Sequence, residues 1–291
     1  MESKQSRNNE ERINEVIGKD SPLVKFPPLP ILKSSKSICK IVTPNTIASG
    51  FLIKLFKNEE YFFCLMTDEH VITKDLIDKK ISISIYYDNE SIAKEIQLNP
   101  SERLIKEFKE INIDATVVEI LSKDNIEKNY FLLPLIDYVD NFDMLLNKEI
   151  TIIQYPLGGE LCYSYGKIEE IYGYEFSHKA STQGGSSGSP VFLKDSMKVI
   201  GLHKCGIKDK SENFGDFIGP IFNYFKNGLN YKISLENGEY YIGELKNKIK
   251  NGKGKIYYND GNIKYDGEFI DDKFEGFGKF YEQNGGYYIG E

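Results

Sequence analysis

The chain has 291 residues, of which 40% are hydrophobic, so it can build one large domain or two smaller ones. Its net charge of −7 excludes a general nucleic-acid role, because a phosphate-binding surface needs a basic excess. No apolar run is long enough to span a bilayer, and residues 1–20 lack the apolar stretch of a signal peptide. We therefore expect a soluble, cytoplasmic protein whose four scattered cysteines are reduced and bind no metal.

In chain order, residues 1–30 are expected to form a flexible lead-in, which the prolines of SPLVKFPPLP keep extended rather than helical. Residues 31–230 then alternate short runs rich in Ile, Val, Tyr and Phe with Gly, Asn, Asp and Pro, a pattern typical of an all-β sandwich or pair of barrels. The predicted strands are SICKIVT, SGFLIKLF, YFFCLMT, ISISIYY, DATVVEI, EITIIQY, GKIEEIYGY, SPVFL and KVIGLHK. Helices are expected at residues 101–110 and 219–229.

Residues 231–291 contain a repeat. Tyr241, Tyr265 and Tyr288 each open a Tyr-x-Gly-Glu segment, at spacings of 24 and 23 residues, and Gly-x-Gly recurs in the two complete copies. Each copy has the pattern of a β-hairpin, and the hairpins are expected to stack because one alone cannot bury its face. The segment resembles the MORN repeat, which implies contact with a protein partner or self-association. The segment carries 9 Lys and 11 Asp and Glu, a net charge of −2, which gives no general attraction to an anionic membrane and does not support membrane association.

The stretch TQGGSSGSPVF, residues 182–192, lies between predicted strands, so its glycines indicate a tight turn rather than a linker. A nucleophilic serine needs such a turn, because its own N–H and that of a nearby glycine must point together at a developing oxyanion. The stretch resembles the Gly-x-Ser-Gly-x-Pro signature of the trypsin-like (chymotrypsin-fold) serine peptidases. The resemblance implies Ser187 as the nucleophile and the N–H groups of Gly185 and Ser187 as the oxyanion hole. A purely structural turn is the alternative.

The same resemblance implies a histidine and an aspartate upstream, in the order His, Asp, Ser. His70 follows an apolar run in YFFCLMTDEHVIT and matches the histidine segment; a lone surface histidine is the alternative. Asp114 opens the run DATVVEI and matches the aspartate; a turn aspartate is the alternative. Asp68 and Asp75 are too close to His70 in sequence to be expected as partners. The implied fold, over about residues 38–229, is all-β: a chymotrypsin-like double β-barrel with a C-terminal helix, followed by a MORN-type β-hairpin array.

Two departures from digestive trypsins bear on regulation. Ser186 replaces the aspartate that pairs with a newly freed N-terminus, and Val71 replaces a disulfide cysteine. Both fit an enzyme that is not activated by proteolysis.

Other residues bear on specificity. Thr182 and His203 match positions that contact an acidic P1 side chain in the glutamyl-endopeptidase branch, although His203 could simply pack in the second barrel. His178 has no evident partner and is expected at the surface.

The predicted function is a serine endopeptidase acting on a peptide or protein substrate. His70 would take the proton as Ser187 attacks the peptide carbonyl, and water would then hydrolyse the acyl-enzyme. No metal or organic cofactor is implied. The repeats would hold the enzyme near a protein partner, a membrane surface or another copy. The alternative is an interaction protein whose peptidase-like domain binds peptides without cutting them.

Overall fold

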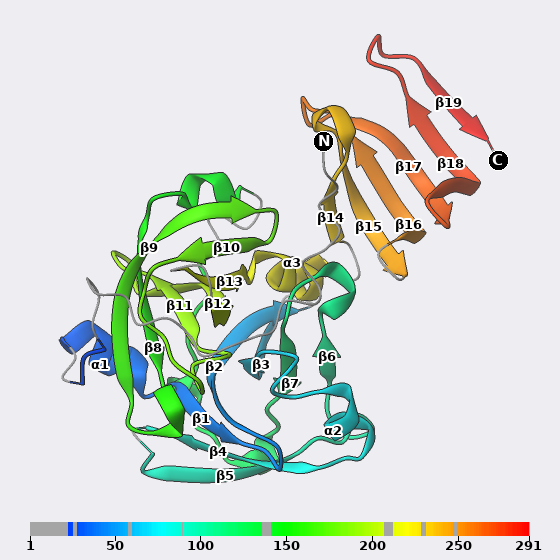
Figure 1. Ribbon diagram of the computed structural model, residues 1–291. Coiled ribbons are helices and arrows are strands. Elements are labelled where there is room, and N and C mark those ends of the chain that lie inside the picture. Colours follow the sequence, from blue (N-terminus) through cyan, green and yellow to red (C-terminus); the bar gives the residue numbers. More distant parts are fainter. Residues whose placement is uncertain are drawn as a thin grey trace. The chain divides into compact units, whose positions relative to one another are not determined.

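The computed structural model describes residues 23–25, 28–57, 60–88, 90–135, 141–206, 212–227, 231–246 and 249–290 (Figure 1). The chain divides into two compact units: one contains residues 61–219 with the chain up to Leu55, and the other contains residues 220–291 with the short segment 56–60. Most of the expected lead-in lies outside the described residues. Its end forms helix α1 (Leu29–Ser35) instead of an extended segment. Pro30 is compatible with that helix because it lies in the first turn, where backbone N–H groups have no partner inside the helix.

A seven-stranded sheet forms the first β-layer, in the order β5-β4-β1-β2-β3-β7-β6. Its strands are β1 (Ile38–Val42), β2 (Ile47–Lys57), β3 (Glu60–Thr67), β4 (Ser82–Tyr87), β5 (Ile92–Gln97), β6 (Ile105–Glu107) and β7 (Thr116–Glu119). Ile96 of β5 and Val118 of β7 share one apolar core with Leu52 and Leu65 of the central strands. The sheet therefore curls around that core, and helix α2 (Lys74–Asp78) buries Leu76 and Ile77 in it.

The second β-layer is a closed barrel, in the order β10-β13-β12-β11-β8-β9. Its strands are β8 (Glu149–Gln154), β9 (Cys162–Tyr172), β10 (Glu175–His178), β11 (Pro190–Leu193), β12 (Lys198–Gly206) and β13 (Asn213–Phe217). Ile152, Ile168, Phe176, Val191 and Phe217 fill its interior. The two layers confirm the predicted double β-barrel.

Short 3-10 turns occur between strands, at η2 (Lys109–Ile111), η3 (Ser122–Asp124), η4 (Lys128–Tyr130), η5 (Phe142–Leu145), η6 (Pro156–Gly158) and η7 (Glu236–Gly238). The helix expected at residues 101–110 is wrong, because Ile105 pairs with Val118 across β6 and β7, and this long-range pairing overrides the local helical spacing. The helix expected at residues 219–229 is confirmed as α3 (Gly219–Asn227).

The repeats form a separate six-stranded sheet in sequence order, from β14 (Tyr231–Ser234) and β15 (Tyr240–Lys246) through β16 (Ile249–Tyr257), β17 (Ile263–Ile270) and β18 (Lys273–Tyr281) to β19 (Tyr287–Gly290). Tyr241, Ile256, Tyr265 and Phe269 make its small core, as the predicted stacking of hairpins requires. Within the described residues, no helix is long and apolar enough to cross a membrane.

Candidate active site

His70 lies in the turn that joins β3 to α2. The chain folds back at Asp68, whose carbonyl accepts the N–H groups of Val71 at 3.1 Å and Ile72 at 3.2 Å. Val71 and Ile72 are buried and anchor the turn in the core, whereas 32% of the His70 side chain remains exposed. The local sequence thus presents the imidazole at the edge of the first layer.

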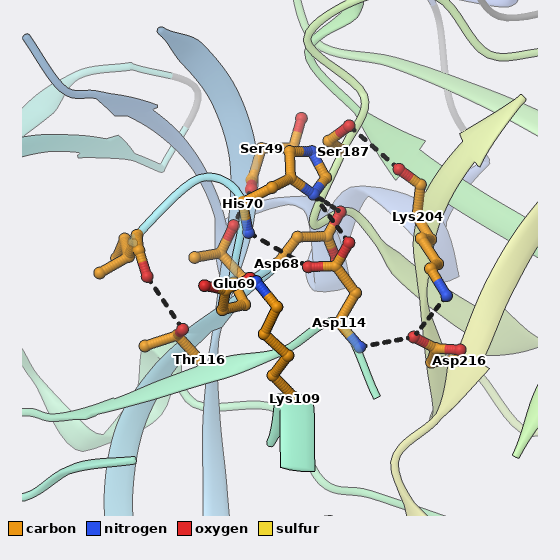
Figure 2. Close-up of polar contacts among 12 residues, drawn as sticks. Ser49, Asp68, Glu69, His70, Lys109, Asp114, Thr116, Ser187, Lys204 and Asp216 are labelled. Atoms are coloured by element: carbon orange, nitrogen blue, oxygen red, sulfur yellow. Dashed lines mark hydrogen bonds and ion pairs between the residues drawn. The ribbon is translucent and has the colours of Figure 1, made fainter. Parts of the chain in front are cut away.

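Asp114 holds this imidazole through two hydrogen bonds (Figure 2). Its Oδ2 lies 2.9 Å from His70 Nδ1, and its Oδ1 accepts the backbone N–H of His70 at 3.1 Å. A carboxylate at Nδ1 favours the tautomer that carries its proton there, which leaves Nε2 as a proton acceptor. The Thr116 hydroxyl donates to the carbonyl of Ile72 at 3.0 Å and ties β7, just after Asp114, to the histidine turn.

A second carboxylate lies beside the same ring. Asp68 is so close to His70 in sequence that it was not expected to be its partner. Its buried Oδ2 nevertheless lies 3.8 Å from His70 Nδ1. The tight turn brings the side chains of these near neighbours onto one side, which sequence separation alone did not reveal. Asp114 remains the nearer partner, and two carboxylates can therefore balance one imidazolium.

Ser187 lies in a tight turn just before β11. Gly185 and Gly188 have φ values of +89° and +82°, a left-handed conformation that side chains with a Cβ rarely adopt. The N–H groups of Ser186 and Gly188 donate to backbone carbonyls of Gln183 and His203, at 2.9 Å and 2.8 Å. Across the described part of the chain, no residue accepts a hydrogen bond from the N–H of Gly185 or Ser187. They are the two N–H groups that the resemblance implies for the oxyanion hole.

This turn packs directly on the first layer. The backbone N–H of Ser49 donates to the Ser187 carbonyl at 3.0 Å, and its hydroxyl donates to the Gly185 carbonyl at 2.8 Å. A Cβ at Gly188 would lie 2.2 Å from Thr67 Oγ1, so the two layers meet three residues before His70. Ser49 opens the predicted strand SGFLIKLF, but nothing in the local sequence indicates this anchoring role.

Figure 2 shows the outer ring nitrogen of His70 on the side of Ser187. The Ser187 hydroxyl donates to the Lys204 carbonyl at 3.2 Å, and among the described residues it makes no hydrogen bond with His70. The nucleophile candidate and the base candidate thus share one site, with the hydroxyl turned towards β12.

The residues predicted for an acidic P1 pocket, Thr182 and His203, are both fully buried in the second barrel. The surface position expected for His178 is wrong: the residue is fully buried, and its Nε2 lies 3.2 Å from His203 Nδ1. The alternation of β10 turns His178 inward, and its strand had not been predicted. Burial, and then the neighbouring His203, hold the pKa of His178 well below its usual value, so this ring stays neutral.

Two further polar residues near the site were not predicted. Asp216 Oδ2 accepts the backbone N–H of Asp114 at 2.7 Å, and Lys204 Nζ lies 3.6 Å from the same oxygen. They lie on barrel strands and match no local motif, so only the folded structure brings them to the site. Among the described residues, no group of three or more His, Cys, Asp or Glu side chains could hold a metal ion.

Comparison with known proteins identifies two families in the chain. The family model of the trypsin-like peptidase domain matches residues 48–202, more than half of the chain, and the chain belongs to this family. The MORN repeat model matches residues 241–263 and 265–287.

Individual relatives match over shorter lengths. A glutamyl endopeptidase of Staphylococcus epidermidis is 39% identical over 84 residues, which are 27% of this chain and 29% of that protein. A glutamyl endopeptidase of Staphylococcus aureus (strain MW2) is 34% identical over 86 residues, or 28% and 24% of the two chains. The match thus spans less than a third of these relatives.

Among solved structures, a Glu endopeptidase in complex with MPD aligns with a TM-score of 0.51 and 17% identity, over 72% of this chain and 96% of that one. At this identity the likeness establishes the shared fold.

Proposed function

We propose that this chain is a serine endopeptidase that uses His70, Asp114 and Ser187 as a catalytic triad. The main support is the double hydrogen bond from His70 to Asp114, at a turn on which the Ser187 turn packs. As Ser187 Oγ attacks the peptide carbonyl, His70 Nε2 takes its proton, and Asp114 stabilises the imidazolium. His70 then gives this proton to the leaving amine, and water hydrolyses the acyl-enzyme in the reverse sense.

The oxyanion of the tetrahedral intermediate would be held by the N–H groups of Gly185 and Ser187. Both lie in the turn that Ser49 fixes from the first layer, and neither donates to a described residue. Donors that are already in place and need no reorganisation are the arrangement that lowers the barrier for acyl transfer.

The hydrogen bond from Ser187 to the Lys204 carbonyl supports the alternative, a domain that binds peptides without cutting them. In a catalytic cycle the hydroxyl has to rotate away from this carbonyl towards His70. The two functions therefore differ in whether Ser187 becomes nucleophilic.

Labelling with a serine-directed diphenyl phosphonate, followed by intact-mass analysis, tests this point. Wild type is expected to gain one adduct, and Ser187→Ala none. Ser189→Ala is the matched control, because Ser189 is fully buried two residues further on and its loss should leave labelling intact. Cleavage of a peptide library should fall about 10⁴-fold or more in Ser187→Ala. A wild-type protein that is neither labelled nor active would favour the silent binder.

The proposal includes a preference for an acidic residue at P1. Thr182 Oγ1 is buried and makes no hydrogen bond to another described residue, so its hydroxyl can donate to a bound carboxylate. The neutral ring of His178 contacts His203 Nδ1 through its Nε2 and so fixes the position of the His203 ring. Thr182→Val and His203→Phe are expected to lower kcat/KM for a Glu substrate relative to its Gln analogue by on the order of tenfold. Equal losses for both substrates would contradict the preference.

The repeats are proposed to bind a protein partner or a second copy. Their last strands expose Phe277, Tyr288 and Ile289, each more than half accessible, as protein-binding surfaces often do. Phe277→Asp combined with Tyr288→Asp should reduce self-association in light scattering, or pull-down of a partner, without changing kcat/KM on a short peptide. Salt-sensitive retention on anionic vesicles would instead indicate membrane association.

A further inference from the structure

A buried carboxylate lies directly behind the triad aspartate. Asp216 lies on β13 of the closed barrel and is fully buried, and its Oδ2 accepts the backbone N–H of Asp114 at 2.7 Å. Asp114 belongs to the loop before β7 of the first layer, so this hydrogen bond joins the two layers behind His70 (Figure 2). Ser49 makes a separate contact between the two layers, on the side of the site that carries Ser187.

Lys204 contacts both Asp216, behind the triad aspartate, and Ser187, the nucleophile candidate. Its Nζ lies 3.6 Å from Asp216 Oδ2 and 2.9 Å from Glu175 Oε2, and its side chain is only 15% exposed. Its backbone carbonyl, on the same residue, accepts the Ser187 hydroxyl. Strand pairing fixes this arrangement, because Asp216 pairs with Glu175 on one side and with Leu202 of β12 on the other.

The charges of this cluster depend on one another. Burial raises the pKa of Asp216 to about 7, although the Lys204 ammonium and the N–H of Asp114 act to lower it. Burial also disfavours the Lys204 ammonium, but the carboxylates of Asp216 and Glu175 outweigh this and raise the pKa of Lys204. A buried ion pair contributes little to stability compared with apolar residues of the same shape, which suggests a role in fixing one geometry.

We propose that Asp216, steadied by Lys204, is a positioning residue that holds the backbone of Asp114 and thereby aims the Asp114 carboxylate at His70. This inference rests on the proposed triad. Asp216 touches neither substrate nor the reacting atoms and acts through Asp114 alone. Without its acceptor, the Asp114 N–H would be buried without a partner and the loop before β7 would shift.

The test compares Asp216→Asn with Asp216→Leu. Asn keeps an oxygen that accepts the Asp114 N–H, and Leu has a similar volume but no acceptor. Asp216→Leu is expected to lose on the order of 10- to 100-fold in kcat with KM nearly unchanged, because the reacting groups are misplaced while the binding residues are not. Asp216→Asn should recover most of kcat. Equal kcat in both variants would overturn the proposal.

Lys204→Met tests the supporting role of the ammonium and keeps the carbonyl that meets Ser187. It is expected to lower kcat less than Asp216→Leu, since the acceptor remains. Lys194→Met is the matched control, because it breaks an exposed ion pair with Glu149 on the same barrel. Equal kcat in Lys204→Met and Lys194→Met would remove Lys204 from the proposal.

One readout does not need activity. The proton shared between His70 Nδ1 and Asp114 should give a downfield NMR resonance in wild type and in Asp216→Asn, and the resonance should move or vanish in Asp216→Leu. If the resonance is present in wild type and moves or vanishes in Asp216→Leu, but wild type is never labelled by the phosphonate, the proposed function fails while the positioning role stands. If the resonance is unchanged in a folded Asp216→Leu, the positioning role fails whatever the activity.

Discussion

Glycine serves different purposes in the Ser187 turn and in the repeat array. Gly188 has a φ of +82°, and a Cβ there would lie 2.2 Å from Thr67 Oγ1 and 2.3 Å from the Ser49 carbonyl. Gly254 of the repeats lies outside the left-handed region, but a Cβ there would lie 2.3 Å from the Tyr241 ring. The turn therefore needs glycine for its backbone path and for the approach of another segment, whereas the repeat needs it as space for an aromatic ring.

The two regions should therefore differ in how well they tolerate a larger residue in place of glycine. A ring that loses its space can tilt, and the same arrangement recurs where Tyr265 lies over Gly267 and Gly278. Each unit of the array contacts only its neighbours, so the effect of a substitution should stay local. The turn instead depends on the left-handed backbone of Gly188 and on its close approach to Thr67 and Ser49 of the first layer. The same substitution should therefore abolish function in one region and only loosen the other.

Among the glycine substitutions, Gly188→Ala in the Ser187 turn should have the largest effect. We expect a loss of about 2–5 kcal/mol in the free energy of unfolding, from the left-handed backbone and the overlap with Thr67, together with loss of phosphonate labelling. Gly173→Ala is the control, since Gly173 has a φ of +67° with no atom within 4 Å of its Cβ position. Thermal unfolding and labelling rates report both variants, and similar losses in the two would show that the contact between layers is unimportant.

In the repeat array, Gly254→Ala is expected to cost about 1–3 kcal/mol by overpacking against Tyr241. Its kcat/KM on a short peptide should match wild type, because the residue belongs to the other compact unit. Hydrogen–deuterium exchange should show faster exchange confined to residues around β15 and β16. A fall in kcat/KM would mean that the two units are energetically coupled, and would contradict the expectation that a change in the repeats leaves the peptidase domain unaffected.

The same contrast explains what the sequence could predict. The Ser187 turn, the repeats and an all-β fold were predictable because glycine spacing, Tyr-x-Gly-Glu periodicity and short aromatic runs are local signals. The double barrel was implied by the resemblance of the Ser187 segment to the trypsin-like peptidases. The strand β6, the burial of His178 and the approach of Asp216 to Asp114 were not. Each depends on a strand pairing between distant segments, such as Ile105 with Val118, and leaves no mark in the nearby residues.

Acid should affect the two units differently, and His178 provides the smallest of the expected effects. All three histidines lie before residue 204, and the repeats contain none. Burial lowers the pKa of His178 from the ordinary value of 6.5, so the folded ring stays neutral where the unfolded one takes up a proton. The stability that this contributes is fully present above pH 6.5 and is lost as the pH falls below it.

Calorimetry at pH 7.5 and pH 5 should therefore show that wild type loses about 1–2 kcal/mol more than His178→Gln between the two conditions. Gln cannot be protonated, and any stability that it loses through the missing contact with His203 applies at both pH values and cancels in the difference. Exchange protection of the repeat amides serves as the internal reference, because no imidazole titrates there. If wild type and His178→Gln lose the same amount, His178 is protonated in the folded protein, and its neutral support of His203 has to be abandoned.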